Sequence, residues 1–301
     1  MSKKMRGNLM LLLTAAIWGS AFVAQSKGMD YIGPFTYNTI RNLIGGLVLI
    51  PVVLLLGRGQ QAKSLSGEEK KLRARKTRIG GICCGAILFL ASSFQQYGLV
   101  HTTAGKAGFI TALYIILVPL MGVFLGRKIP RIIWGCVVLA IAGFWLLCIK
   151  EGFTLGLGDL MVLICAVFYA MHIMTIDHFS PHVDGVKMSC IQFFTAGLIG
   201  LLPALLFESM VFAAIWEAKW TILYAGVLSS GVAYTLQILA QRDTDPTVAT
   251  LLMSLESVFA ALTGWLILGE RMLPKELFGC LLVFTAVILA QIPLPVKTKR
   301  A

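Results

Sequence analysis

A single acidic residue, Glu256, stands inside a long apolar stretch of the sequence. The stretch runs from Pro246, which follows Asp245 as a capping residue, to Leu268, and all its other positions are apolar or small. At a rise of about 1.5 Å per residue, Glu256 falls near the middle of a bilayer-spanning helix. A carboxylate at that depth is costly unless it faces a bundle interior or a wet cavity. Glu256 is therefore our first candidate for binding a substrate ammonium or a coupling proton, and a packing role is the alternative.

Two cations accompany other apolar stretches. Arg41 lies within the stretch 34–57, and Lys106 lies at the start of the stretch 104–126. A guanidinium keeps its charge in proteins and binds a carboxylate through two hydrogen bonds, so Arg41 predicts recognition of an anionic group. Lys106 is a second candidate for the same anion. Either side chain could instead extend to the membrane surface.

The other candidate site residues carry aromatic, amide or imidazole groups within apolar stretches: Trp18, Gln95, Tyr114, Tyr169, His172 and Gln237. Such groups in hydrocarbon either contact a substrate or bond to neighbouring helices, and the sequence leaves both uses open. His172 and Asp177 form the H-x4-D pattern of some acyltransferases. A five-residue step separates them by about 140° on a helix, which argues against a shared catalytic site.

The composition is that of a polytopic membrane protein. Hydrophobic residues make up 57% of the chain and charged residues 13%, whereas soluble domains have about 25% charged residues, and the mean hydropathy is +0.83. The net charge of +12 does not indicate a nucleic-acid partner, because the Lys and Arg residues gather at the ends of apolar stretches. The seven Cys residues show no metal-ligand spacing, so we expect no metal and no cofactor.

Ten apolar stretches divide the chain. We therefore expect an all-α membrane protein with ten transmembrane helices. Gly or Pro residues mark seven of the boundaries of these stretches. The predicted spans cover residues 7–26, 34–57, 79–99, 104–126, 131–149, 158–178, 185–207, 219–241, 246–268 and 274–294.

The distribution of positive charge predicts the orientation in the membrane. The segment 58–78 contains eight Lys and Arg residues and should stay in the cytoplasm. With the N-terminus on the same side, 19 Lys and Arg residues lie on the cytoplasmic side and 6 on the other. We expect a multi-pass protein of the cytoplasmic membrane with both termini in the cytoplasm.

An internal repeat relates the two halves, which we define as residues 7–149 and 158–294. Gly7-Asn8-Leu9-Met10 returns as Gly158-Asp159-Leu160-Met161, and Pro130 with Gly135-Cys136 returns as Pro274 with Gly279-Cys280. Each half has five spans, an odd number, so the second half must enter the membrane inverted, and such repeats place a binding site near the midplane. The repeat pairs Tyr114 with Glu256, Gln95 with Gln237 and Trp18 with Tyr169.

Three features resemble the EamA family of the drug/metabolite transporter superfamily: AAIWGSAFVA at 15–24, Arg41 in the second span, and LESVFAALTGWLILGERMLPKELFGCLLVFTAVILA at 255–290. The resemblance covers residues 7–291. The first half departs from the family pattern, with Gly126-Arg127-Lys128 where an L-G-E-R segment is typical. The resemblance implies a ten-helix, inverted-repeat carrier of small organic metabolites, often exported, with peripheral fifth and tenth helices.

We therefore expect a secondary transporter that exports small organic metabolites such as amino acids by alternating access around a midplane site. Its partners would be the small-molecule substrate, a proton as candidate coupling ion and the lipid bilayer, and a homodimer is a candidate assembly. A channel and, less favoured, an intramembrane enzyme are the alternatives. No ring of like charges or filter loop supports a channel in the sequence.

Overall fold

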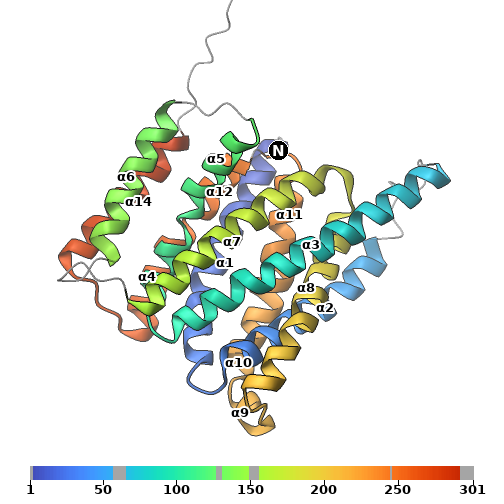
Figure 1. The fold of residues 1–301 in the computed structure, drawn as a ribbon, viewed down its shortest axis with the longest axis horizontal. Coiled ribbons are helices and arrows are strands. Elements are labelled where there is room, and N and C mark those ends of the chain that lie inside the picture. Colours follow the sequence, from blue (N-terminus) through green and yellow to red (C-terminus); the bar gives the residue numbers. More distant parts are fainter. Residues whose placement is uncertain (1–2, 57–65, 127–130, 149–155, 245, 292–301) are drawn as a thin grey trace, which may run out of the picture.

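The computed structural model describes residues 3–56, 66–126, 131–148, 156–244 and 246–291, which form helices and turns without a strand among them (Figure 1). Membrane spans are recognised by a long apolar helix. Seven helical segments meet this description: Met5–Gly28, Pro34–Leu55, Gly67–Leu99, Ala104–Phe124, Leu157–His182, Gly185–Phe207 and Lys219–Gln241. The chain is thus an all-helical protein with several helices able to cross a membrane.

Each of the ten predicted stretches coincides with helical structure. The first half contains α1 (Lys3–Gly28), α2 (Pro34–Leu56), α3 (Gly67–Leu99), α4 (Ala104–Thr111), α5 (Tyr114–Phe124) and α6 (Arg131–Cys148). The second half contains α7 (Leu157–Phe179), the short turn η2 (Ser180–His182), α8 (Gly185–Phe207), α9 (Phe212–Glu217), α10 (Lys219–Leu223), η3 (Tyr224–Tyr234), α11 (Thr235–Gln241), α12 (Pro246–Met253), α13 (Glu256–Thr263), η4 (Gly264–Leu268) and α14 (Pro274–Gln291).

Three of the stretches are interrupted, although the sequence predicts continuous helices. The stretch 104–126 divides into α4 and α5, and 246–268 divides into α12 and α13. At both breaks backbone hydrogen bonds join residues that are three positions apart instead of four. Ile116 N donates to Leu113 O at 2.9 Å, and Val258 N donates to Leu255 O at 3.1 Å. The stretch 219–241 widens instead into the π-helical segment η3, a distortion often found at functional sites.

The helices pack as a bundle with one pair set apart at its edge. α6 and α14 lie against each other at the left of the view in Figure 1. α2 packs along α8, and α3 packs along both α7 and α8. α1 lies in the middle, in contact with α13, η3 and α11. This arrangement surrounds the two interrupted spans with longer, unbroken helices.

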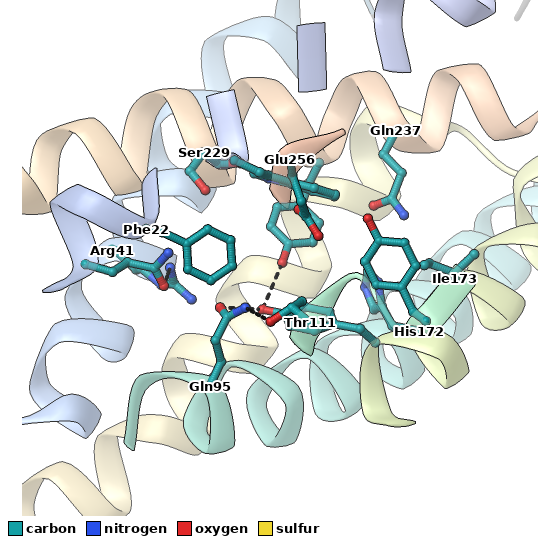
Figure 2. Close-up of a pocket in the computed structure, with 14 residues that line it drawn as sticks. Phe22, Arg41, Gln95, Thr111, His172, Ile173, Ser229, Gln237 and Glu256 are labelled. Carbon is teal, nitrogen blue, oxygen red and sulfur yellow. Dashed lines mark hydrogen bonds between the residues drawn. The ribbon is translucent and has the colours of Figure 1, made fainter. Parts of the chain in front are cut away.

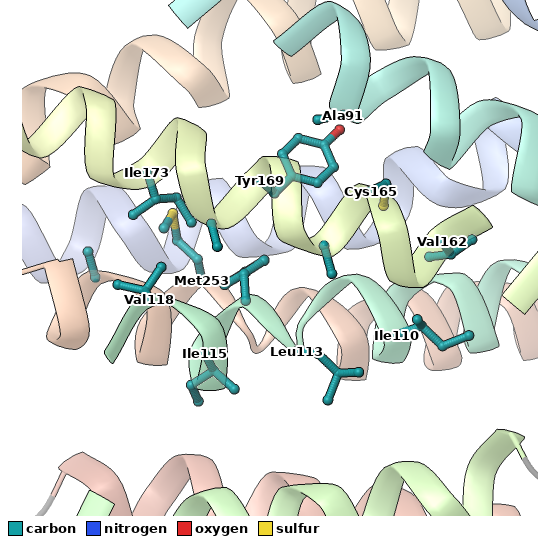
Figure 3. Packing of buried hydrophobic residues seen from close by; sticks show 14 of the residues in the cluster. Ala91, Ile110, Leu113, Ile115, Val118, Val162, Cys165, Tyr169, Ile173 and Met253 are labelled. Carbon is teal, nitrogen blue, oxygen red and sulfur yellow. The ribbon is translucent and has the colours of Figure 1, made fainter. Parts of the chain in front are cut away.

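The main apolar core fills the space between α7 and the interrupted helices. Figure 3 shows Val162 and Ile173 of α7 on one side and Ile110, Val118 and Met253 on the other. All five side chains are buried. The burial and close packing of these side chains hold the interrupted helices against α7.

Two glycines let the neighbouring helices approach α13. A Cβ atom placed on Gly19 of α1 would lie 2.3 Å from Phe259 Cβ and 2.5 Å from Glu256 O. A Cβ atom on Gly108 of α4 would lie 2.6 Å from Ala260 Cβ. Small residues at such crossings allow close backbone contact in membrane bundles. They bring α1 and α4 directly against the start of α13.

Candidate functional site

A buried cavity lies where the interrupted helices meet α1, α2, α3 and α7 (Figure 2). The free space enclosed between its lining side chains is about 30 Å³. Eight of the nine candidate residues from the sequence line it: Trp18, Arg41, Gln95, Tyr114, Tyr169, His172, Gln237 and Glu256. The repeat pairs inferred from the sequence therefore face one space.

The breaks in the helices place Tyr114 and Glu256 in this cavity. Tyr114 is the first residue of α5, and Glu256 is the first residue of α13. Leu113 and Leu255, which precede them, make no side-chain capping bond. Both breaks thus present a polar side chain to the cavity at the start of a new helical segment.

The Glu256 carboxyl is nearly enclosed, with 3% of the residue exposed. The Tyr114 side chain lines the same cavity. Tyr114 Oη and Glu256 Oε1 both lack a hydrogen-bond partner among the described residues. An unsatisfied buried polar atom costs about 1–3 kcal/mol. A ligand or proton that satisfied these two atoms would recover that free energy.

Arg41 brings a buried positive charge to the same cavity. Only 4% of the residue is exposed, and its Nη1 donates to Gln25 Oε1 at 2.7 Å. Gln25 is held in turn by its own Nε2, which donates to Ala21 O at 3.3 Å. Arg41 Nε has no partner, and none of the ion pairs between described residues includes Arg41. The guanidinium therefore has free donors for an anionic group.

Figure 2 shows Arg41 and His172 at opposite ends of the cavity, with Glu256 between them. The two formal charges of the site thus come from different halves of the chain, Arg41 from α2 and Glu256 from α13. A cavity with a fixed cation and a separate carboxyl group suits a ligand that carries both an anionic and a cationic group.

A chain of hydrogen bonds fixes one wall of the cavity. Tyr234 Oη donates to Tyr169 Oη at 3.4 Å, and Tyr169 Oη donates to Gln95 Oε1 at 3.1 Å. Gln95 Nε2 then donates to Thr111 Oγ1 at 3.1 Å. These bonds link α3, α4, α7 and η3, so the polar groups of this wall are oriented before any ligand binds.

Aromatic rings form another part of the wall. Trp18 Nε1 donates to Ser229 O at 3.3 Å, and the Trp18 and Tyr234 ring centroids lie 4.5 Å apart. The Ser229 carbonyl belongs to the π-helical segment η3, a distortion often found at functional sites. The Trp18 indole is thereby anchored in the cavity lining.

His172 lines the far end and does not form a catalytic pair with Asp177. Its Nε2 lies 3.1 Å from Gln192 Oε1, and its Nδ1 has no hydrogen-bond partner in the described part of the chain. α7 continues without a break past both residues, so the five-residue step keeps them on different faces of the helix. The H-x4-D pattern is therefore not assembled into a site.

Lys106 lies away from the cavity. Its Nζ forms an ion pair with Glu276 Oε1 at 3.2 Å, in a separate pocket between α4, α13 and α14.

Six residues that line the cavity were not predicted from the sequence: Phe22, Gln25, Thr111, Ile173, Ser229 and Tyr234. Of these, Gln25 could have been found as an amide at the end of an apolar stretch, but its contact with Arg41 depends on the fold.

Comparison with known proteins identifies the family. A family model described as the EamA-like transporter family matches residues 5–149 and 156–291. The chain belongs to this family. A relative from Archaeoglobus fulgidus, named an uncharacterized transporter, is 31% identical over 292 residues, which are 96% of this chain and 87% of the relative. These matches identify a membrane transporter rather than an enzyme.

A second relative has a more specific name. A probable terminal-alkyne amino-acid exporter from Streptantibioticus cattleyicolor is 25% identical and covers 93% of this chain and 91% of its own length. A protein of known crystal structure superimposes with a TM-score of 0.72 over 95% of this chain and 96% of that chain, at 18% sequence identity. That similarity shows a shared fold.

The structure also explains the L-G-E-R segment by which this EamA-like chain resembles its family. Gly269 adopts a left-handed conformation with φ of 68°, which favours glycine. The next residue, Glu270, then accepts hydrogen bonds from the N–H groups of Ala104 at 2.8 Å and Gly105 at 3.0 Å. The segment thus caps α4 in the other half of the chain. In the first half, Gly126 also has a positive φ of 78°, while Arg127 and Lys128 lie outside the described residues.

Proposed function

We propose that this EamA-like protein is a secondary transporter that exports small metabolites carrying both a carboxylate and an ammonium group, such as amino acids. The observation that carries the proposal is the shared cavity of Arg41 and Glu256. Arg41, which has no carboxylate partner among the described residues, binds the substrate carboxylate. Glu256 binds the ammonium group or a proton. The amino-acid exporter among the relatives supports the same substrate class.

The transporter has ten membrane spans arranged as two inverted repeats of five. The packing supports this arrangement, because the helix contacts occur in symmetric sets. α2 with α8 and α6 with α14 are pairs of corresponding spans. The contact between α3 and α7 corresponds to the contact between α1 and the segment from α10 to α11. The contact between α4 and α13 corresponds to the contact between α5 and α12. A pseudo-two-fold axis through the cavity accounts for all of these contacts.

Alternating access moves the cavity between the two sides of the cytoplasmic membrane. Burial in hydrocarbon penalises the charged form of a carboxyl group, whereas water or a bound cation favours it. Glu256 experiences both situations as the cavity opens and closes. It therefore releases a proton when substrate binds and takes one up when substrate leaves, so that substrate and proton exchange across the membrane.

The test is transport by the purified full-length protein in proteoliposomes. Saturable counterflow of a labelled amino acid, driven by unlabelled amino acid on the other side, is expected of a carrier. Unitary currents would show a channel instead, and chemical turnover without a gradient would show an enzyme. Metabolite levels inside and outside cells that overproduce or lack the protein then give the direction of transport, and accumulation inside the overproducing cells would contradict export.

A further inference from the structure

A second polar pocket lies at one end of the bundle, far along α3 from the transport cavity. α3 has 33 residues and is therefore about 50 Å long, whereas the hydrocarbon core of a bilayer is about 30 Å thick. The predicted span begins at Ile79, so the first three turns of α3 project beyond it. This projecting part contains most of the basic segment 58–78 that the structure describes.

The projecting part of α3 meets η2 and the end of α11 around an open pocket with an empty volume of about 870 Å³. We call it the basic pocket. Its lining consists of Glu69, Leu72, Arg73, Lys76, Pro181, His182 and Arg242. Three of these residues are permanent cations at neutral pH, and one is an acid.

The charges of the basic pocket are not neutralised from within. Neither Lys76 nor Arg242 forms an ion pair with another described residue. Arg73 donates from Nη2 to Val183 O at 3.1 Å, which orients its guanidinium beside η2 and leaves further N–H groups free. Arg73 and Lys76 are half-buried, in contrast to the exposed Lys70, Lys71 and Arg75 of the same helix.

The nearby acids have other partners or lie outside the lining. Glu69 accepts the Ser66 N–H at 2.8 Å in the capping box of α3, and the backbone and side-chain hydrogen bonds of Ser66 lower the pKa of its carboxyl. The Asp184 carboxylate pairs with Lys187 Nζ at 3.6 Å. Asp243, next to Arg242, is exposed and does not line the pocket.

The basic pocket lies at the depth of the lipid headgroups. Arg73 and Lys76 precede Ile79 by six and three residues, so they lie about 5–9 Å beyond the hydrocarbon core, at the depth of lipid headgroups. We propose that the basic pocket binds a phosphate group, supplied either by the headgroup of an anionic phospholipid or by a soluble phosphate compound. Arg73 and Arg242 donate hydrogen bonds to the phosphate oxygens, and Lys76 adds a third positive charge. The bound phosphate joins α3 of the first half to η2 and α11 of the second.

The test compares two triple variants of the full-length protein with equal loss of charge. Arg73→Gln/Lys76→Gln/Arg242→Gln removes the cations of the basic pocket, and Lys70→Gln/Lys71→Gln/Arg75→Gln removes exposed cations from the same helix. Native mass spectrometry measures retention of phosphatidylglycerol against phosphatidylcholine, and calorimetry measures binding of inorganic phosphate. We expect the pocket variant to bind the anionic probe roughly tenfold or more weakly than wild type, and the control variant to stay within about twofold.

The outcomes separate the sources of the phosphate group. Selective retention of phosphatidylglycerol without phosphate binding identifies a lipid site, and saturable phosphate binding identifies a soluble ligand. Equal losses in both triple variants, or equal retention of the two lipids by wild type with no phosphate binding, would overturn the proposal. Because Arg73 also bonds to Val183, the double variant Lys76→Gln/Arg242→Gln, which keeps that bond, must also bind the anionic probe more weakly than the control variant does if the basic pocket is the site.

Discussion

Tyr114 and Glu256 begin the second segments of two interrupted helices and line the same cavity. The repeat pairs the same two positions, 142 residues apart. One half of the chain thus supplies a hydroxyl and the other a carboxyl at corresponding places. The near-symmetric backbone holds an asymmetric pair of side chains, so an ionisable group is present on one side of the site only.

The first prediction concerns Glu256→Gln. The amide keeps the shape of a protonated carboxyl group but cannot ionise, so the protein should insert and fold normally and lose net transport driven by a pH gradient. Exchange of substrate for substrate should survive, since it needs no net proton movement. Proteoliposome assays with and without a pH gradient measure both activities.

Ser257→Ala is the matched control for Glu256→Gln. Ser257 is also buried, but its hydroxyl bonds to Ser254 O at 2.7 Å and does not line the cavity. It should retain pH-driven transport. Transport by Glu256→Gln at the wild-type rate, with the same pH dependence, would make Glu256 a packing residue.

The second prediction concerns Arg41→Gln. Hydrogen bonds to charged groups contribute about 1.5–3 kcal/mol each, so the variant should bind carboxylate-bearing substrates roughly 10- to 100-fold more weakly. Its affinity for the amide of the same amino acid should change little. Competition of acid and amide against one labelled substrate measures this difference. Folding should persist, because Arg41 has no carboxylate partner among the described residues that its loss would leave unpaired.

Lys106→Gln tests whether Arg41 acts through its position rather than its charge alone. Lys106 pairs with Glu276 outside the cavity, so its replacement should leave the preference for the acid over the amide unchanged. A preference that persists in Arg41→Gln and disappears in Lys106→Gln would reverse the assignment of the anion site.

The third prediction is topological. In a background without native cysteines, a membrane-impermeant reagent should label Ser209→Cys from outside the cell and His182→Cys only after the membrane is opened. Both positions are exposed at turns on either side of α8. Labels in the segments 58–65 and 150–155, which lie outside the described residues, should be internal and external respectively. An internal 150–155 segment would contradict the inverted repeat.

The sequence predicted the positions of the helices and most of the cavity lining, because hydrophobic length and isolated polar residues are local features. It did not predict the breaks before Tyr114 and Glu256. The fourth predicted span is interrupted at Ala112 and Leu113, upstream of Pro119. The segment around Ser254 and Leu255 has no Gly or Pro at all. Both breaks depend on tertiary packing against α1 and α7, which a single sequence does not display.

The residues that the sequence missed make contacts across long separations. Gln25 and Arg41 are neighbours only because α1 and α2 converge. Lys106 was expected near the substrate, but the fold places Glu276, 170 positions away, within 3.2 Å of it. Charge type could be read from the sequence, whereas the choice of partner could not.

The last prediction concerns Glu270, whose role also depends on a distant contact. Its carboxylate accepts the first two N–H groups of α4, and Glu270→Ala would leave both without an acceptor. The loss should destabilise the protein by about 1–3 kcal/mol. Glu270→Gln should also destabilise it, because the amide keeps one of the two acceptor oxygens and leaves the other N–H group without an acceptor. Thermal unfolding in detergent measures both changes. Glu217→Ala, at an exposed acid in α9, is the control and should have almost no effect. If Glu270→Ala and Glu217→Ala unfold at the same temperature, the cap does not stabilise α4, and the L-G-E-R segment must be explained by its pocket with Lys106 and Glu276 instead.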